Sequence, residues 1–435
     1  MSSSEKTVLT KPTLTEAQVV ELAERLYGLK VSSVQPMPSY DDQNFHILVS
    51  ENQAIRDHGH SYVLKVMNTA DSEDADLIEA QTRAMMFLCE KGFPAPTPIP
   101  TIDGKIMSLE TIEQENECRR HMIRLLTYLP GTPFVNLTLD DRTFYKMGRT
   151  FAQMDKALHE EFRHPSTKSL HREGFRWNLS NFHLLEKYLP EMKEGETRSI
   201  VKQVLEQFKE KEFQHPNMKS LQRPDFLWKL SNIHLLDKYL YTLGEGGNRQ
   251  IVEQIIQQFQ EVILPNLCRF HQSLNHGDFS HTNILVQPVH TSADRSDLTE
   301  LQQQLDISGL LDFSDMNYGY YVFDVAISIM YLMLGSNDPV SAGGHVLSGF
   351  ESVIPLLPEE RNAMFLLVLC RFSQSLVLGR YNALLYPENA EYLLSTGRAG
   401  WKCLRQLWSL GQEAVGKIWF ETASPTAFDA DPVSV

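Results

Sequence analysis

One acidic and one amide side chain stand five residues apart in a short loop between apolar segments. Asp278 lies two residues after His276, and Asn283 immediately precedes an apolar run, while a later apolar run ends in Asp312. Oxygen ligands at strand ends can hold Mg²⁺ on phosphates, and an acid in the loop can orient and deprotonate an attacking hydroxyl. The spacing therefore suits phosphoryl transfer, with Asp278 as the base and Asn283 and Asp312 as metal ligands.

The same residues also allow a simpler interpretation. An Asp and an Asn in an exposed turn usually form that turn, and an Asp after a strand often caps a helix. The spacing of one acid and one amide is common by itself. The functional interpretation depends on the surrounding motif, which comprises residues 276–286 and 309–313.

A phosphate-binding lysine and an acid that holds it are expected upstream of such a loop. Residues 61–66 alternate in the manner of a strand, which would carry Lys65 and pair with a strand over 45–49. Residues 74–91 have helical spacing and end at a glycine, a typical C-cap. Glu79 in this helix is predicted to pair with Lys65. Taken alone, Lys65 would more often be a solvated lysine at a strand end.

The segment that would cover the phosphates is residues 38–45, and it has neither the G-x-G-x-x-G nor the P-loop pattern. Ser39 and Asn44 offer hydrogen-bond donors to phosphate. Asp41 and Asp42 would repel phosphate unless their side chains turn away.

A hinge is predicted at residues 122–128, an apolar strand that Pro130 and Gly131 stop. We expect the nucleotide base to bond the backbone there, around Leu126 to Tyr128. Because such bonds use backbone groups, the sequence does not distinguish GTP from ATP.

These motifs, in this order, resemble the aminoglycoside phosphotransferase and choline-kinase-like family, the small-molecule branch of the kinase fold. The resemblance spans residues 15–420 and implies an α+β, two-lobed, protein-kinase-like fold. An N-lobe with an antiparallel sheet and a helix is expected over residues 1–128. A mostly helical C-lobe is expected over 129–422, and residues 423–435 look like a disordered tail.

Matching to the family also assigns roles to single residues. Asp278 matches the catalytic base, Asn283 and Asp312 match Mg²⁺ ligands, and Lys65 with Glu79 matches the phosphate grip. These assignments, with those below, rest on the printed motifs. The histidine that braces the catalytic loop is matched by His276, and an aspartate that supports this loop from the following helix is matched by Asp324.

Three segments, residues 38–46, 124–131 and 316–323, carry a closer resemblance within the family. It implies a phosphotransferase with an alcohol group as acceptor, which moves the γ-phosphoryl of GTP or ATP to 5-hydroxy-L-lysine with Mg²⁺. Ethanolamine, choline and homoserine remain alternative acceptors. An inactive nucleotide-binding pseudokinase is a further alternative, whereas a protein kinase is disfavoured because no A-P-E segment follows Asp312.

An internal repeat departs from the family pattern. Residues 164–210 align with residues 215–261 at a constant offset of 51. Two copies are too few for a solenoid, which needs about three. The family carries one such helical insert, so we interpret residues 164–261 as a duplicated insert. Either an exon was duplicated in tandem or two alternative exons were joined artificially, and an extra copy that reshapes the substrate pocket would favour the pseudokinase.

Contacts to the acceptor are the least defined part of the site. Asp315 is placed to meet an ammonium group, or it caps the following helix. Arg223 and Trp228 in the second copy of the insert are candidates. An arginine could hold a carboxylate through two parallel hydrogen bonds, and the further candidates are Arg371, Tyr381 and Glu351.

Composition limits the partners and the compartment. The 435 residues, 42% of them hydrophobic, suffice for two cores. A net charge of −15 disfavours a nucleic-acid partner and favours a cationic amino-acid substrate. The five cysteines are scattered without a C-x-x-C pair, which indicates reduced thiols. We expect a cytoplasmic enzyme without a secretory signal or membrane span, and no obligate protein partner is evident.

Overall fold

The computed structural model describes residues 11–50, 59–114, 117–137, 139–163, 226–288 and 305–422. Residue contacts divide the chain into two compact units. Unit 1 contains the described residues up to Thr132, together with later segments that begin at Ile284 and end at Ser314. Unit 2 contains the other described residues. The sequence predicts one continuous N-terminal lobe, and unit 1 differs in including the later segments.

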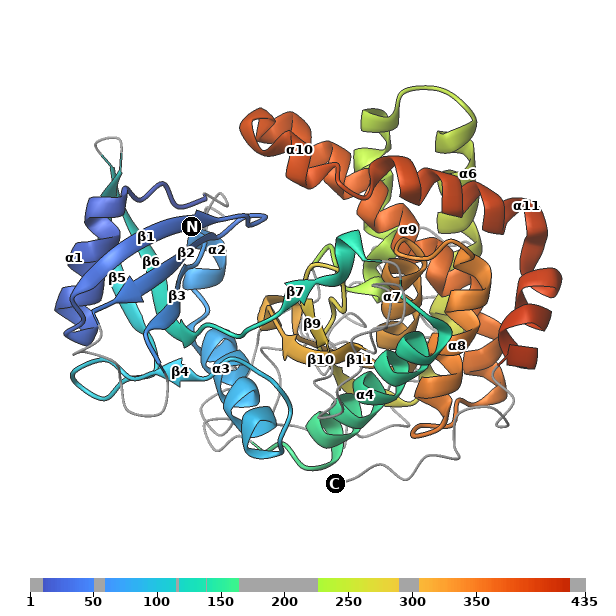
Figure 1. The fold of residues 1–435 in the computed structure, drawn as a ribbon. Coiled ribbons are helices and arrows are strands. Elements are labelled where there is room, and N and C mark those ends of the chain that lie inside the picture. The colour runs from blue at the N-terminus through green and yellow to red at the C-terminus, as the bar shows by residue number, and fades with distance from the viewer. Residues whose placement is uncertain are drawn as a thin grey trace, which may run out of the picture. The chain divides into compact units, whose positions relative to one another are not determined.

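An antiparallel sheet forms the base of unit 1. Its strands are β1 (Val31–Met37), β2 (Gln43–Val49), β3 (Ser61–Val66), β4 (Pro98–Ile99), β5 (Ser108–Gln114) and β6 (Glu117–Thr127). The order is β1-β2-β3-β6-β4, and β5 also pairs with β6 (Figure 1). Alternate side chains of β2 are buried, as expected for a strand with one face on a core. The predicted pairing of residues 45–49 with 61–66 is confirmed, since His46 lies opposite Val63.

Helices α1 (Glu16–Tyr27), α2 (Thr69–Ser72) and α3 (Ala75–Glu90) complete this part of unit 1. Thr15 and Gln18 form a capping box that starts α1. Val19 of α1 belongs to the same buried cluster as Phe45 of β2. The predicted helix over 74–91 is confirmed, and Asp74 caps it by accepting a hydrogen bond from the Leu77 amide.

The later segments of unit 1 add strands β9 (Ile284–Pro288) and β10 (Leu305–Leu310). These two strands pair antiparallel, and β7 (Thr132–Pro133) lies on the other side of β9. The Leu310 amide donates a 2.8 Å hydrogen bond to the Pro94 carbonyl. Both apolar runs that flank the predicted catalytic residues are therefore strands, and β10 delivers Asp312 just beyond its end.

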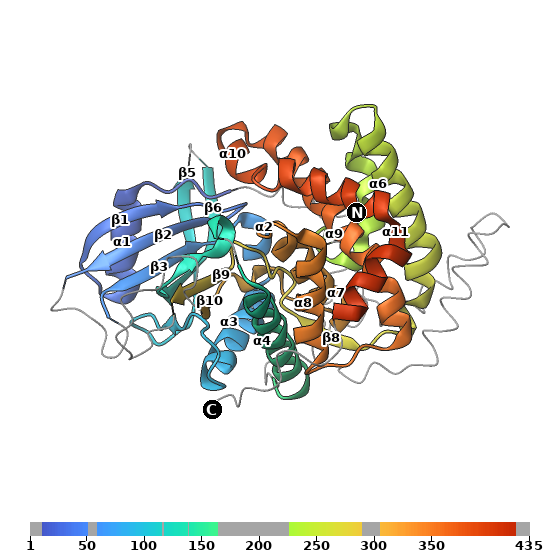
Figure 2. The same cartoon turned by 45° about the vertical axis from the view of Figure 1, so that its right-hand side comes forward.

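Unit 2 is mostly helical (Figure 2). Helix α9 packs against η6, α7 and α11, and β8 pairs antiparallel with β11. The elements are η2 (Phe134–Asn136), α4 (Asp141–Glu160), η6 (Leu230–Leu243), α6 (Gly247–Gln258), η7 (Phe259–Ile263), η8 (Leu264–Arg269), β8 (Gln272–Asn275), η10 (Phe313–Asp315), β11 (Asn317–Tyr320), α7 (Tyr321–Met333), α8 (Pro339–Glu351), α9 (Pro358–Leu385), η11 (Pro387–Asn389), α10 (Ala390–Leu393) and α11 (Gly397–Thr422).

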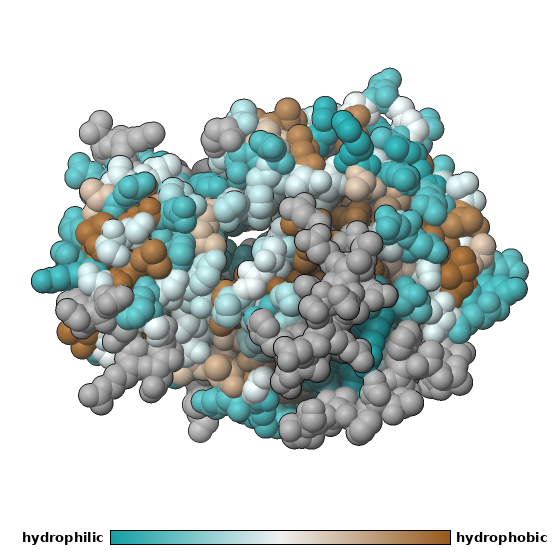
Figure 3. Space-filling view, in the orientation of Figure 1, coloured by the Kyte–Doolittle hydropathy of each residue, from teal (hydrophilic) through white to brown (hydrophobic). Residues whose placement is uncertain are grey.

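Helix α9 is the core helix of unit 2. It is long and apolar enough to cross a membrane, but 94% of its most apolar window is buried inside the protein. Burial on all sides explains why its sequence lacks a polar face. On the face drawn in Figure 3, hydrophobic residues form scattered patches among hydrophilic ones.

Helices α4 and α8 approach each other closely at two glycines. A Cβ atom at Gly148 would lie 2.0 Å from the Val346 carbonyl oxygen, and one at Gly349 would lie 1.9 Å from the Tyr145 carbonyl oxygen. Backbone contact of this kind is open to glycine alone. The pair fixes α4 on α8.

The predicted repeat is described only in part. The first copy, Arg223 and the predicted tail over 423–435 lie outside the described residues. From Phe226 onward the second copy forms η6 and α6, and it buries Ile233, Leu236 and Ile255. This part of the insert packs against α9.

Candidate active site

Lys65 is a buried cation in unit 1. It is 6% exposed, and its Nζ lies 3.0 Å from Asp42 Oδ2 and 3.0 Å from Asp312 Oδ1. On the neighbouring strands it faces Asn44 and Arg124. Burial lowers the pKa of the Lys65 ammonium, but the two carboxylates outweigh this effect and raise that pKa above its usual value. Lys65 is therefore kept protonated.

Asp42 is a partner of Lys65 that the sequence did not assign. It is 4% exposed, and its Oδ1 accepts hydrogen bonds from the Asn68 amide (2.8 Å) and from Asn68 Nδ2 (3.1 Å). Asn68 is also the N-cap of α2. The Asp42 side chain thus turns into unit 1, which removes the repulsion of phosphate expected for this acid.

Asp312 follows β10 with a left-handed backbone, at φ 55°. Its Oδ1 accepts a 3.2 Å hydrogen bond from the Ser314 amide, and Gln81 of α3 donates to the Ser314 carbonyl at 2.9 Å. Partial desolvation of its carboxylate, whose side chain is still 43% exposed, raises the pKa of Asp312, but Lys65 and Ser314 outweigh this effect and hold that pKa well below its usual range. Asp312 is therefore ionised.

Glu79 does not pair with Lys65. Its Oε1 lies 3.5 Å from Arg83 Nη2, one turn further along α3. Among the described residues, the carboxylates within ion-pair distance of Lys65 belong to Asp42 and Asp312. The structure thus differs from the predicted Lys65–Glu79 pair, because the buried ammonium already has two carboxylate partners.

Ser39 and Asn44 were predicted to donate hydrogen bonds to phosphate. The Ser39 hydroxyl donates to the Asp42 carbonyl inside the turn. The Oδ1 of Asn44, by contrast, is buried and has no hydrogen-bond partner among the described residues. An unpaired buried oxygen is unfavourable, but this oxygen is an acceptor, so it is not the donor that was predicted for phosphate.

The predicted hinge lies where β6 ends. The amide of Thr127 donates to the Thr97 carbonyl at 2.9 Å, and that of Tyr128 donates to the Ser61 carbonyl at 3.2 Å. Leu126 is paired with β3 and with β4. Two of the hinge amides are thus used inside unit 1, and base binding by Leu126 and Tyr128 stays a prediction.

In unit 2, the backbone of the Asp278 loop is fixed by Asp324. The Asp324 carboxylate accepts hydrogen bonds from the amides of His276 (2.7 Å) and Gly277 (3.1 Å). Gly277 has φ 86°, and a Cβ there would lie 2.4 Å from the Asp315 carbonyl oxygen. The His276 ring stacks on Phe279 with a centroid distance of 4.5 Å. Backbone bonds and ring packing together fix the path of the loop.

Asp278 itself is bound through both carboxylate oxygens. Arg371 Nη2 lies 2.8 Å from its Oδ1, and Asn283 Nδ2 lies 2.7 Å from its Oδ2. Arg371 is only 1% exposed, whereas the Asp278 side chain is 22% exposed. Asp278 therefore combines a fixed orientation with access for a small molecule.

Asp324 shares its surroundings with Asp155 of α4, and both carboxyl groups are buried. Burial raises the pKa of Asp324 to about 7, although hydrogen bonds from the loop and the charge of Arg371 lower it. Burial, the charge of Asp324 and a hydrogen bond to it raise the pKa of Asp155 well above its usual value. We conclude that Asp155 is a neutral acid beside the Asp324 carboxylate.

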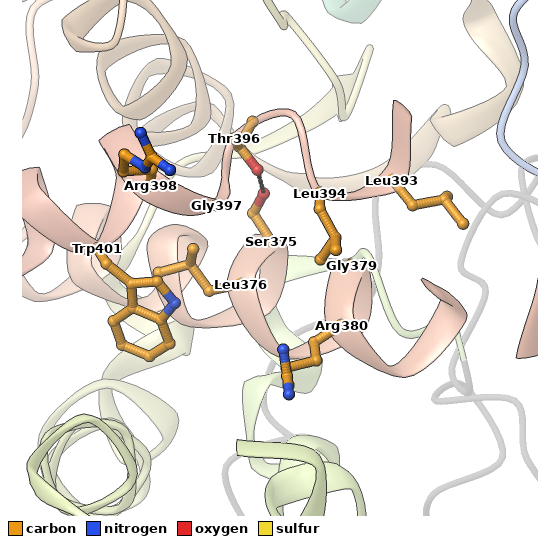
Figure 4. A pocket seen from close by; sticks show the side chains of 10 residues that line it. All are labelled: Ser375, Leu376, Gly379, Arg380, Leu393, Leu394, Thr396, Gly397, Arg398 and Trp401. Carbon is orange, nitrogen blue, oxygen red and sulfur yellow. Dashed lines mark hydrogen bonds between the residues drawn. The ribbon is translucent and has the colours of Figure 1, made fainter. Parts of the chain in front are cut away.

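A pocket of about 260 Å³ lies between α9 and the segment from α10 to the start of α11 (Figure 4). Ser375 and Thr396 line it, and their hydroxyls are hydrogen-bonded to each other at 3.2 Å. Arg380, Arg398 and Trp401 also line the pocket. Ser375 is one turn, about 6 Å, from Arg371 along α9, so the pocket adjoins the helix that delivers Arg371.

Of the predicted acceptor contacts, Trp228 packs against Arg371, which in turn binds Asp278. The Arg371 guanidinium is 5.0 Å from the centre of the Trp228 ring. Asp315 lies beside Gly277 through its carbonyl group, and its charge raises the pKa of the Arg371 guanidinium, which burial lowers. Arg223 lies outside the described residues.

Asp42 and Asp155 gained a role only in the structure, and Arg371, a candidate for the acceptor carboxylate in the sequence, instead binds Asp278. One sequence signal was available for Arg371, because a charged residue interrupts an apolar stretch of α9. Asp155 likewise stands among the buried positions of α4. Buried charges of this kind need a partner, but a sequence does not say which one.

The predicted metal ligands each retain one oxygen. Asn283 uses Nδ2 for Asp278, which leaves its Oδ1, and Asp312 uses Oδ1 for Lys65 and Ser314, which leaves its Oδ2. Mg²⁺ is typically held by one or two protein oxygens, waters and substrate phosphates. Each residue thus has an oxygen of the kind that can bind such an ion, and the described part of the chain has no group of three or more His, Cys, Asp or Glu that could hold a metal ion.

Known proteins resemble this chain in sequence and in fold. The model of the "Phosphotransferase enzyme family" matches residues 33–351. Hydroxylysine kinases of Bos taurus and Xenopus laevis are each 43% identical to the chain, with 95% of both chains covered. The solved structure of a microcompartment-associated aminopropanol kinase covers 91% of this chain and 98% of its own, with a TM-score of 0.52 at 14% identity, which supports the fold alone.

These findings confirm three predictions from the sequence: the family resemblance, the kinase-like α+β fold, and a phosphotransferase with an alcohol group as acceptor. The family model alone covers well over half of the chain. The chain belongs to the phosphotransferase enzyme family.

Proposed function

We propose that the protein transfers the γ-phosphoryl group of GTP or ATP to the hydroxyl of 5-hydroxy-L-lysine in a Mg²⁺-dependent reaction. The relatives that share 43% identity over 95% of the chain are hydroxylysine kinases. The structural observation that carries the proposal is the pair of hydrogen bonds on Asp278, from Arg371 and from Asn283. They hold an accessible carboxylate in one orientation.

Asp278 is the general base in this proposal. Its carboxylate accepts the hydroxyl proton of the acceptor while the acceptor oxygen forms a bond to the γ-phosphorus. The bond from the γ-phosphorus to the bridging oxygen breaks, and the nucleoside diphosphate leaves. Positioned acid–base groups contribute about 10²–10⁴-fold to such reactions.

Lys65 is the cation that we assign to the phosphates. Bound Mg²⁺ would neutralise charge on the phosphate oxygens, and we assign Asn283 and Asp312 as its ligands. Asp42 then remains as the buried partner that keeps Lys65 protonated and in place, 3.0 Å from its Nζ. In this proposal Asp42 has the role that was predicted for Glu79.

The acceptor is a cationic amino acid with two ammonium groups and one carboxylate, and we propose one group of the protein for each kind of charge. The net charge of −15 favours its approach, and Asp315 is our candidate for an ammonium group. For the carboxylate we propose the pocket lined by Arg380 and Arg398, because arginine binds carboxylates through paired hydrogen bonds.

We further propose that the enzyme works in the cytoplasm on this small molecule, without nucleic acid, membrane or obligate protein partner. All five cysteines are free thiols, and Cys370 and Cys403 are buried. Such thiols are usual in a reducing compartment.

The test is phosphoryl transfer by the purified chain with Mg²⁺ and either GTP or ATP. The acceptors are 5-hydroxylysine, lysine, ethanolamine, choline and homoserine. Transfer to hydroxylysine but not to lysine is expected, and Asp278→Asn should lower kcat by at least about 10²-fold. Asp237→Asn, at an exposed position of η6, is the matched control and should retain activity.

Two other results would replace the proposal. Preference for another acceptor would keep the mechanism and change the substrate. If no acceptor reacts while nucleotide still raises Tm, deletion of residues 164–214 decides the outcome. Recovered activity would identify the extra copy of the insert as an inhibitor, and continued silence would support the pseudokinase.

A further inference from the structure

Arg371 is a buried charge for which the proposed reaction has no direct use. It stands in the middle of α9, is 1% exposed, and reaches Asp278 across 93 positions of the chain. A buried guanidinium loses its hydration, so its position must be supported by several contacts. The described residues provide these contacts on both faces and on two nitrogens.

The guanidinium of Arg371 lies between two aromatic rings. Its Cζ is 5.0 Å from the centre of the Trp228 ring and 5.2 Å from that of Tyr331. Nη1 donates to the Trp228 carbonyl at 3.0 Å. Gln374, one turn away, donates to the carbonyls of Leu227 and Lys229 and so holds the Trp228 backbone from both sides.

With Nη1 bound in this way, Nη2 is directed to one atom, Asp278 Oδ1 at 2.8 Å. The other oxygen of Asp278, Oδ2, accepts a hydrogen bond from the side-chain Nδ2 of Asn283. Each oxygen of the Asp278 carboxylate therefore accepts a hydrogen bond from a different residue. Arg371 comes from a buried helix and Asn283 from the same loop as Asp278, so Oδ1 is fixed by the core and Oδ2 by the loop.

We propose that Arg371 is a positioning residue, which fixes Oδ1 of Asp278 so that Oδ2 receives the proton of the acceptor. The inference rests on the proposed function of Asp278. It assigns Arg371 to the base and not to the carboxylate of the acceptor. A carboxylate ligand would need two free donors on one accessible edge. Nη1 and Nη2 are used, both faces are covered by rings, and Nε, which has no partner among the described residues, is buried.

Arginine suits this task better than lysine. Its planar fork directs two nitrogens at fixed angles and stacks on aromatic rings, whereas lysine presents one rotatable ammonium. Arg371→Lys thus keeps the charge beside Asp278 but loses the geometry. Arg371→Ala removes both and leaves a gap between the rings of Trp228 and Tyr331.

The experiment compares two acceptors, 5-hydroxylysine and its decarboxylated analogue, which keeps the hydroxyl and both amines. For Arg371→Ala we expect kcat to fall about 10²-fold with both acceptors, the size typical of a misplaced catalytic group. KM for each acceptor should change by less than about two-fold, as expected when ground-state binding is kept. Arg371→Lys should show a smaller loss in kcat with the same pattern.

Millimolar guanidinium ion should restore part of the activity of Arg371→Ala, because it fits the space between the rings. It should not restore Asp278→Asn. The matched control is Arg361→Ala on the same helix. Arg361 pairs with Glu351 at 2.7 Å, and its side chain is 47% exposed, so its loss should leave kcat unchanged. A rise in Tm on adding nucleotide shows that each variant is folded.

Three results would overturn the inference. An increase in KM for hydroxylysine but not for the decarboxylated analogue would make Arg371 a ligand of the acceptor carboxylate. Unchanged kcat in folded Arg371→Lys and Arg371→Ala would show that Asp278 does not need it. Loss of the nucleotide-dependent rise in Tm in both variants would make Arg371 a structural residue. A wild-type chain without transfer would contradict the proposed function instead.

Discussion

The Nζ of Lys65 and the Oδ1 of Asp312 are 3.0 Å apart, although 247 positions separate the two residues along the chain. Asp42 lies on the same ammonium at 3.0 Å. One cation thus stands between two carboxylates, and Asp42 is as deeply buried as the lysine. Removing one member of a buried pair leaves the other without compensation, so this group can be tested through stability as well as activity.

Lys65→Met should therefore destabilise unit 1 and weaken nucleotide binding together. We expect the free energy of unfolding to fall by about 3–5 kcal/mol, because Asp42 loses its buried counter-charge. The matched control is Lys105→Met. Lys105 pairs with Asp103 at the surface, with side chains 69% and 58% exposed, and its loss should leave stability unchanged because water screens such a pair. Urea unfolding and the KM for nucleotide measure the two effects, and equal stability of the two variants would contradict the buried ion pair.

Two substitutions at Asp312 can separate the effect of its charge from the effect of its backbone conformation. Its φ of 55° is left-handed, a region that Asn tolerates and Ala does not. Asp312→Asn should lower kcat while the fold keeps most of its stability. Asp312→Ala should lower kcat and also lose about 1–2 kcal/mol more in the free energy of unfolding. Chemical denaturation of both variants checks this, and indistinguishable unfolding midpoints would show that the backbone there is unstrained.

Gly277 tests the packing of the catalytic loop. Gly277 and Gly92 share a φ of 86°, but a Cβ at Gly277 would lie 2.4 Å from the Asp315 carbonyl oxygen, while one at Gly92 meets nothing within 4 Å. Gly92→Ala should destabilise the protein by about 1 kcal/mol through its backbone alone. Gly277→Ala should destabilise it more and also lower kcat, since the loop must move. Thermal melts and steady-state rates give the comparison, and matching losses would remove Asp315 as the cause.

The Asp155–Asp324 pair makes a prediction about pH. Both groups have raised pKa values in the folded protein, that of Asp324 to about 7. A raised carboxyl pKa contributes stability that is fully present below the unfolded pKa, near 4, and is lost as pH rises through the folded pKa. The free energy of unfolding of the wild type should thus fall by at least about 2 kcal/mol between pH 4 and pH 8, since each pKa unit is worth about 1.4 kcal/mol.

Asp155→Asn should make that pH dependence shallower. An Asn at this position carries no charge and does not titrate, so Asp324 loses a like-charged neighbour and is ionised over a wider range. Unfolding in urea at a series of pH values would reveal the change in slope. Asp237→Asn, at an exposed position, should leave the slope as in the wild type. A variant at residue 155 with the wild-type slope would assign the titration to other groups.

Local sequence signals were sufficient for the elements that carry the predicted site residues. The alternation over 61–66, the cap at Asp74 and the loop that ends at Asn283 each follow from neighbouring residues, and the structure has β3, α3 and β9 there. The predicted partner of Lys65 was Glu79 of α3, whereas one observed partner is Asp42, which lies just before β2. Asp42 lies beside Lys65 because β2 pairs with β3. In this position Asp42 binds a lysine, although an acid near the phosphates had seemed unfavourable.

Long-range contacts account for the other differences. Arg371 reaches Asp278 from a helix 93 positions away, and Asp155 lies with Asp324 although α4 and α7 are far apart in sequence. A buried charge in an apolar stretch shows that a partner exists, but many acids in the chain could fill that place. Packing of complete helices selects the partner, and no local pattern encodes it.

Unit 1 is built from an N-terminal segment and from segments much later in the chain. This arrangement has a consequence for synthesis on the ribosome. Residues up to Thr132 emerge long before Asp312 has been added, and at about 5–20 residues per second the delay is on the order of ten seconds or more. During that interval the nascent sheet holds Lys65 without its distant carboxylate. Asp42, only 23 positions ahead of Lys65 in the chain, is already present as a counter-ion. It allows the first strands to close around a buried lysine before the rest of the site has been translated.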